Sequence, residues 1–159
     1  AFEVISNDNF AVLQNDNQTG IIFSEDSTNT PFFFSRPYRF DDFRFFPDHS
    51  GGRERYQARA FIIARMENKL GIITEKEKFM LPMEYDDITL EGNIFFLKKN
   101  GKTGFFILHT SYPAIEAKYD AFLYNYSIPV KDNWRFGLFL VKQGDKTGYV
   151  GENGVEFFR

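Results

Sequence analysis

Hydrophobic and polar residues alternate in short runs along the chain, and polar pairs that contain glycine separate these runs. The clearest stretch is 95–108, where the apolar runs Phe95–Leu97 and Phe105–Leu108 flank a polar centre. The pair Asn100–Gly101 in this centre favours a type I′ turn, in which both central residues have positive φ. The pattern therefore predicts a β-hairpin over residues 95–108.

The same pattern recurs around three other glycines, so the chain contains an internal repeat. The glycines equivalent to Gly104 are Gly20, Gly71 and Gly148, and an apolar run follows each of them. A fixed self-similarity of this kind is typical of repeat architectures, in which one unit of strands stacks on the next. The sequence gives only a weak indication of helix at any point in the chain. The best candidate, residues 65–69, is too short to form a helix.

An aromatic corner containing aspartate follows the first three glycines, at 37–43, 82–88 and 116–122. The chain opens with a second half of a unit and closes with a first half. Pairing of the two ends would complete a fourth unit and hide two sheet edges. Alternation with period two is also clear at 138–143 and 154–157, and Asn153–Gly154 is a second candidate for a type I′ turn.

We therefore predict an all-β fold: a four-unit antiparallel hairpin or meander array in a single domain over 1–159. The units cover roughly 6–45, 61–90, 94–123, and 138–159 together with 1–5.

Two motifs carry a family resemblance. Gly-Lys-Thr-Gly-Phe-Phe occupies 101–106 and Asp-Lys-Thr-Gly-Tyr-Val occupies 145–150, while Pro-Met-Glu-Tyr-Asp-Asp-Ile occupies 82–88. Together they resemble the WG-repeat (KWG) family, mostly bacterial β-rich arrays of unknown function. The resemblance implies a β-repeat fold. The tryptophan that names the family is replaced at all four places, by Thr19, Leu70, Thr103 and Thr147.

The amino-acid composition favours β-strands and argues against some classes of binding partner. The 21 Phe and 8 Tyr residues suit half-buried pleated surfaces, and the formal net charge of −3 gives no electrostatic basis for binding nucleic acid or an anionic membrane. No apolar run approaches the roughly 20 residues of a membrane-spanning helix, so no membrane insertion is expected. Cysteine is absent, which excludes thiol chemistry but leaves the compartment open between the cytoplasm and, after removal of a leader, a secreted or periplasmic location.

Residues with catalytic character do not form a pattern. Asp41, Asp86 and Asp120 fall in different units, where an aspartate after an aromatic residue is expected to cap its own turn. The sequence Asp48-His49-Ser50 consists of consecutive residues, whereas a catalytic triad needs three side chains that converge from different segments. We expect no enzyme activity, no metal site and no cofactor.

Two insertions remain, over 46–60 and 124–136, at equivalent places of the first and third units. Insertions in a repeat array project to one face, which is often the binding face, and Arg, Tyr and Trp dominate interface energetics. The candidate partner-binding residues are Arg53, Arg55, Tyr56, Tyr126, Trp134 and Arg135. In a competing interpretation, Trp134 and the tyrosines close off the rim of the core.

The sequence thus predicts a non-catalytic module that binds another protein or a peptide, with a small immunity or inhibitor protein as a specialised form. The alternative is a secreted or cell-surface module that contacts glycans, in which exposed Tyr and Trp stack on sugar rings.

Overall fold

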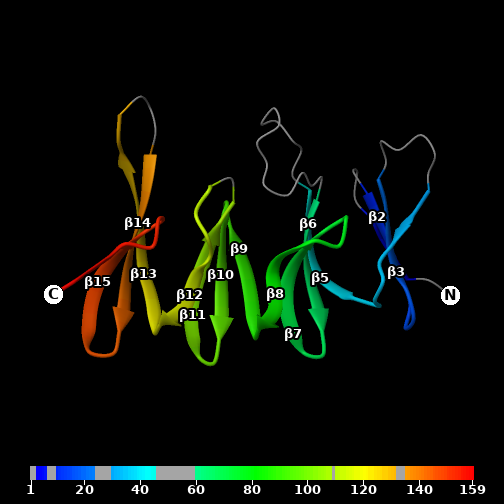
Figure 1. Cartoon of the computed structure of the whole chain (residues 1–159), viewed down its shortest axis with the longest axis horizontal. Helices are drawn as coiled ribbons and strands as arrows, with labels where there is room; N and C mark the ends of the chain where they lie inside the picture. The colour runs from blue at the N-terminus through cyan, green and yellow to red at the C-terminus, as the bar shows by residue number, and fades with distance from the viewer. Residues whose placement is uncertain (1–2, 7–9, 24–29, 46–59, 109, 132–134) are drawn as a thin grey trace. The chain divides into compact units, whose positions relative to one another are not determined.

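A computed structural model describes residues 3–6, 10–23, 30–45, 60–108, 110–131 and 135–159. The described residues form sixteen strands and no helix. The strands make four antiparallel sheets of four strands, and in each sheet the strands follow one another in chain order. The all-β prediction is confirmed, and Figure 1 lets each sheet be followed by its colour.

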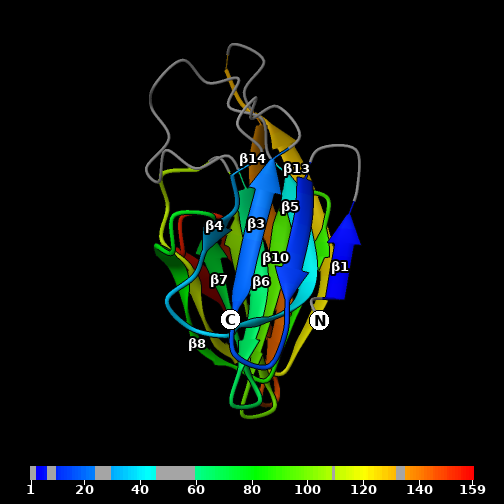
Figure 2. The same cartoon turned by 90° about the vertical axis from the view of Figure 1, so that its right-hand side faces the viewer.

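The chain divides into two compact units, Ala1–Glu84 and Tyr85–Arg159. Unit 1 holds the first two sheets, and Figure 2 looks onto the first of them, with β1 at one edge and β4 at the other. The strands of the first sheet are β1 (Glu3–Ser6), β2 (Phe10–Gln14), β3 (Thr19–Phe23) and β4 (Phe32–Phe33). Those of the second sheet are β5 (Arg39–Phe45), β6 (Ala60–Met66), β7 (Lys69–Thr74) and β8 (Phe79–Tyr85).

Unit 2 repeats this plan with the third and fourth sheets. The strands of the third sheet are β9 (Asp87–Glu91), β10 (Ile94–Lys99), β11 (Lys102–Ile107) and β12 (Ile115–Tyr119). Those of the fourth sheet are β13 (Ala121–Pro129), β14 (Arg135–Gln143), β15 (Lys146–Gly151) and β16 (Glu156–Phe158).

Each unit closes around its own apolar core, to which both of its sheets contribute. The core of unit 1 comprises Phe10, Val12, Ile21, Phe23, Phe34, Tyr38, Ile62, Ala64 and Ile73. The core of unit 2 comprises Ile94, Phe105, Ile107, Ile115, Tyr119, Phe139, Val141 and Val150. Because side chains on a strand alternate between the two faces, the core residues of β2 (Phe10 and Val12) and of β14 (Phe139 and Val141) are two positions apart.

The hairpin predicted over 95–108 is present as β10 and β11. Asn100 and Gly101 have φ of 52° and 73°, as a type I′ turn requires. The same turn joins β6 to β7, where Glu67 and Asn68 have φ of 51° and 63°. The second predicted turn of this type is wrong, because Gly154 alone of its pair has positive φ.

The repeat is visible in strand register. In all four sheets the anchoring glycine lies directly opposite a residue of the strand before it: Leu13 faces Gly20, Ala64 faces Gly71, Leu97 faces Gly104 and Val141 faces Gly148.

These glycines are required by close packing. None of them has positive φ. A Cβ on Gly71 would lie 2.8 Å from the carbonyl oxygen of Leu81, and one on Gly104 would lie 2.2 Å from that of Ile115. Because the fourth strand passes directly over this position, a side chain has no room there.

The sheets divide the chain differently from the expected units, since the strand after each aromatic corner begins the next sheet. Val4, Phe40, Ile88 and Phe122 occupy the same row of their sheets, opposite Leu13, Ala64, Leu97 and Val141. Each sheet therefore reaches four strands without the pairing of the chain ends that the sequence left possible.

Candidate functional site

The structure describes two of the six predicted partner-binding residues. Tyr126 lies on β13 and Arg135 on β14. The others lie outside the described residues: Arg53, Arg55, Tyr56 and Trp134. The predicted joint surface of the two insertions therefore stays a prediction.

Tyr126 and Arg135 lie on opposite faces of the β13–β14 hairpin. Tyr126 faces Leu138, whereas Arg135 faces Pro129, three residues after Tyr126, and faces alternate along a strand. The guanidinium of Arg135 donates to the hydroxyl of Ser127 at 2.7 Å and to its carbonyl oxygen at 2.6 Å. Arg135 thus stabilises the hairpin itself, and the two predicted residues lie on opposite faces of it.

The hairpin extends beyond the rest of its sheet. β15 pairs with β14 from Leu138 onward, whereas Ile128 facing Phe136 and Pro129 facing Arg135 continue the pairing past that point. Figure 1 shows this part, yellow to orange, rising above the rest of the fourth sheet.

One face of the fourth sheet carries an exposed aromatic row. Strand register places Tyr124, Leu140, Tyr149 and Phe157 side by side across all four strands, with Tyr126 next to Tyr124 along β13. Tyr124 is 61% exposed and Phe157 58%. The rings of Tyr124 and Tyr126 lie 4.6 Å apart between centroids, and those of Tyr126 and Tyr149 lie 6.0 Å apart. We call these five residues the tyrosine face.

The opposite face of the same sheet supplies Phe139, Val141 and Val150 to the core of unit 2. The fourth sheet is therefore apolar on both faces, one buried and one open. Sequence reasoning named only Tyr126 of the tyrosine face. The alternation of Tyr124 with Tyr126 was a usable signal, whereas Tyr149 was hidden inside the repeat motif.

Asp86 and Asp120 have a structural role, but through another partner than expected. The carboxylate of Asp86 accepts a hydrogen bond from the backbone N–H of Asn100 at 2.7 Å, and that of Asp120 accepts one from Gly144 at 2.6 Å. Each aspartate caps the central hairpin turn of the following sheet. The side-chain ammonium of Lys102 also pairs with Asp120, and these two donors lower the pKa of its carboxyl, Lys102 contributing most.

The expected equivalence of Asp41 with these residues is wrong. Phe40 lies in the row of Ile88 and Phe122, so Asp41 follows that row, within a strand irregularity between Phe40 and Asp42. The side chain of Asp41 lies outside the described residues.

Each unit also contains a buried tyrosine whose hydroxyl donates to a glutamate, which lies between β7 and β8 in unit 1 and on β16 in unit 2. Tyr38 donates to Glu77 at 3.2 Å, and Tyr119 donates to Glu156. Burial, followed by the neighbouring glutamate, raises the pKa of both tyrosines above the usual value. Lys118, 2.8 Å from Glu156, together with Tyr119 lowers the pKa of Glu156. Because the arrangement occurs in both units, we interpret it as a tie between sheets.

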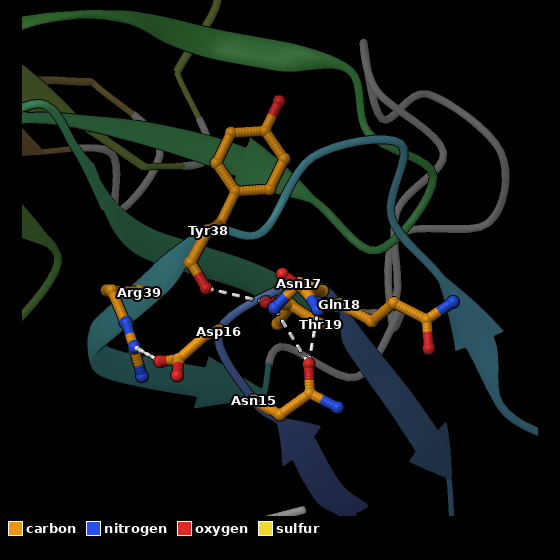
Figure 3. Close-up of polar contacts among 7 residues, drawn as sticks. All are labelled: Asn15, Asp16, Asn17, Gln18, Thr19, Tyr38 and Arg39. Carbon is orange, nitrogen blue, oxygen red and sulfur yellow. Dashed lines mark hydrogen bonds and ion pairs between the residues drawn. The ribbon is translucent and has the colours of Figure 1, made fainter.

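Figure 3 shows polar contacts at the β2–β3 turn of unit 1, where neighbouring groups hydrogen-bond to one another. The side-chain oxygen of Asn15 accepts from the backbone N–H groups of Asn17 and Gln18, both at 2.8 Å. The hydroxyl of Thr19 donates to the carbonyl of Tyr38 at 2.7 Å. These hydrogen bonds shape the turn.

We searched the described residues for groups that could hold a metal ion or a phosphate. In the described residues, no group of three or more His, Asp or Glu side chains could hold a metal ion. Both histidines, His49 and His109, lie outside them. Gly101 to Gly104 belongs to a hairpin with no helix N-terminus to bind phosphate. Within the described part of the chain, no helix has the length and apolar character to cross a membrane.

These features define an all-β protein of repeated four-stranded meander sheets with an exposed tyrosine face on its last sheet. No protein-family model, curated protein or solved structure matches the chain.

Proposed function

We propose that this protein is a non-catalytic module that binds another protein or a peptide, and that the tyrosine face is the contact surface. The observation that carries the proposal is the row of Tyr124, Leu140, Tyr149 and Phe157 with Tyr126 beside it, in which all four aromatic residues are exposed. Contiguous exposed apolar surface is uncommon on soluble monomers and marks interaction sites.

The residue types favour a protein partner. Tyrosine offers a large apolar ring and a hydroxyl, and it is enriched where protein surfaces meet. The ring planes of Tyr124 and Tyr126 are inclined by 58°, and those of Tyr126 and Tyr149 by 59°. Inclined rings form shallow pockets for side chains, whereas stacking along a sugar chain needs rings that lie flat. This geometry favours a protein or peptide over a glycan.

The WG-repeat assignment is part of the same proposal. Its support is the common row in which Gly20, Gly71, Gly104 and Gly148 lie opposite the preceding strand. The family resemblance adds no partner of its own.

Selection from a phage-displayed library of random peptides tests the binding proposal. A variant with Tyr124→Ser, Tyr126→Ser and Tyr149→Ser is compared with the wild type. A matched control is Phe79→Ser, which removes an aromatic ring of unit 1 that is 49% exposed. Peptides selected on the wild type should bind the triple variant at least about tenfold more weakly and the control unchanged.

Two results would contradict the proposal. Selected peptides that bind the triple variant as well as the wild type would place the contact elsewhere. Binding to a glycan array that depends on the same tyrosines, without peptide binding, would establish the glycan alternative. The variants should keep the far-UV circular dichroism spectrum, because the substituted side chains are exposed.

A further inference from the structure

Edge strands expose unpaired backbone N–H and C=O groups, and proteins protect them with charged residues, proline or short length. Seven of the eight edge strands in the described sheets are protected in this way. β1, β5, β9, β12 and β16 contain charged residues, β8 contains both Glu84 and Pro82, and β4 has only two residues.

β13 lacks such protection over all but its last residue, Pro129. It is nine residues long, the longest of the edge strands, and contains no Asp, Glu, Lys or Arg. Its residues from Leu123 to Pro129 are all exposed. β13 is therefore long, uncharged and exposed, a combination that the other edge strands lack.

The part of β13 that is free to pair has defined ends. A register shift between Phe122 and Tyr124 interrupts the strand near its start, and Pro129, which has no N–H to donate, ends it. Between them lie Tyr124 to Ile128, five residues of regular antiparallel strand. Tyr124, Tyr126 and Ile128 share one face, and Asn125 and Ser127 share the other.

We propose that β13 is a dimerisation edge, at which a second copy of this chain adds its own β13 in antiparallel orientation. This inference goes beyond the proposed function, which concerns the tyrosine face of one copy. A two-fold axis brings each residue of Tyr124–Ile128 opposite a residue of the same segment. The segment pairs with itself without opposing like charges, since Tyr126 then lies opposite Tyr126 of the second copy and Tyr124 opposite Ile128.

The charged edges could not pair with themselves in this way. In β12, self-pairing would set Glu116 or Lys118 near its own copy, and like charges opposite one another destabilise a sheet. Neutrality over the whole segment is thus the feature that selects a second copy as the occupant of β13.

A weak dimer is expected. Five paired residues bury far less than the roughly 800 Å² per partner of a standard interface. The dissociation constant should therefore lie on the order of 10–100 μM, and the dimer should form only at high protein concentration.

Sedimentation velocity over a range of protein concentrations tests the inference. Asn125→Lys adds a charge to the edge, on the face away from the tyrosines. Gln143→Lys makes the same charge change at an exposed residue at the end of β14, a strand that is not an edge, and serves as the control. The wild type and the control should dimerise alike, and Asn125→Lys should weaken the dimer at least about tenfold.

Hydrogen exchange on dilute and concentrated protein gives a second readout that needs no variant. Protection should increase with concentration at the amides of 124–128. A wild type that stays monomeric at all concentrations, a dimer that Asn125→Lys leaves intact, or concentration-dependent protection confined to other strands would overturn the inference. Because peptide binding by the tyrosine face is measured on dilute protein, failure of the dimer leaves the proposed function untouched.

Discussion

The two compact units achieve the same closure with different residues. In unit 1 the buried tyrosine that reaches the second sheet is Tyr38, two residues before Phe40, and in unit 2 it is Tyr119, three residues before Phe122. Each donates its hydroxyl to a glutamate of that sheet or of the loop between its strands. The two tyrosines therefore make the same kind of contact, a hydrogen bond to a glutamate, although they occupy different positions in the repeat.

The ion pairs at the same corners have opposite sense. In unit 1 the acid, Asp16, lies in the hairpin turn and the base, Arg39, follows the tyrosine, as Figure 3 shows. In unit 2 the base, Lys102, lies at the hairpin and the acid, Asp120, follows the tyrosine. What both units keep is a charge pair that fixes the corner to the hairpin, whichever partner carries the negative charge.

Gly20 and Gly104, the anchoring glycines in the first sheet of each unit, should give the largest difference. A Cβ on Gly104 meets backbone atoms of Ile115 at 2.2 Å and of Ala117 at 2.7 Å, and backbone cannot move aside. A Cβ on Gly20 first meets the ring of Phe33 at 2.8 Å, and this ring is 42% exposed. We expect Gly104→Ala to lower the free energy of unfolding by about 3 kcal/mol and Gly20→Ala by about 1 kcal/mol.

Chemical denaturation followed by circular dichroism measures both changes. Lys146→Ala, at an exposed hairpin position, is the control and should cost under about 0.5 kcal/mol. Equal and small effects at Gly104 and Gly20 would mean that the crossing fourth strand does not make these glycines necessary.

The sequence carried enough information to predict the hairpins and the repeat. Alternation around Asn100–Gly101 predicts both the strands and the turn, because few residues other than glycine and asparagine accept positive φ. The sequence alone does not decide whether Gly104 serves a positive φ or a close approach of another strand. The answer depends on how closely β12 approaches Gly104, and the local sequence pattern carries no information on that distance.

The strand register at the aromatic corners could not be predicted from the local sequence pattern, for a related reason. Aligned without gaps, Pro37–Phe43 matches 82–88, so that Phe43 corresponds to Ile88. In the structure, however, Phe40 lies in the row of Ile88. A strand irregularity absorbs the difference, and its position depends on packing. The tyrosine face was missed likewise, since residues far apart in the chain meet only when four strands are in register.

The tyrosine ties should give a smaller effect that depends on pH. Tyr119→Phe removes one hydrogen bond to a charged acceptor, while Glu156 keeps Lys118 as a partner, so we expect a loss of about 1–2 kcal/mol at neutral pH. Because the pKa of Tyr119 is raised in the folded protein above the value of 10.0 for an unperturbed tyrosine, its contribution is fully present below that pH. It is lost as the pH rises through the folded pKa.

Unfolding measured from neutral to strongly alkaline pH checks both parts. The stabilities of the wild type and Tyr119→Phe should converge above pH 10, and Tyr38→Phe should give the same shape in unit 1. A constant difference between wild type and variant across this range would show that the hydroxyl contributes nothing that ionisation removes.

Exchanging the charges at the two corners should give the smallest effects and the sharpest contrast. In unit 1, Asp16→Arg with Arg39→Asp rebuilds an exposed pair, so stability should stay within about 0.5 kcal/mol of the wild type. In unit 2, Lys102→Asp with Asp120→Lys rebuilds the pair but leaves the backbone N–H of Gly144 without its acceptor, since a lysine ammonium only donates. Thermal unfolding should therefore show a lower melting temperature for the unit 2 exchange than for the unit 1 exchange. Equal melting temperatures would mean that Asp120 acts through its charge alone and that its cap on the β14–β15 turn adds no stability.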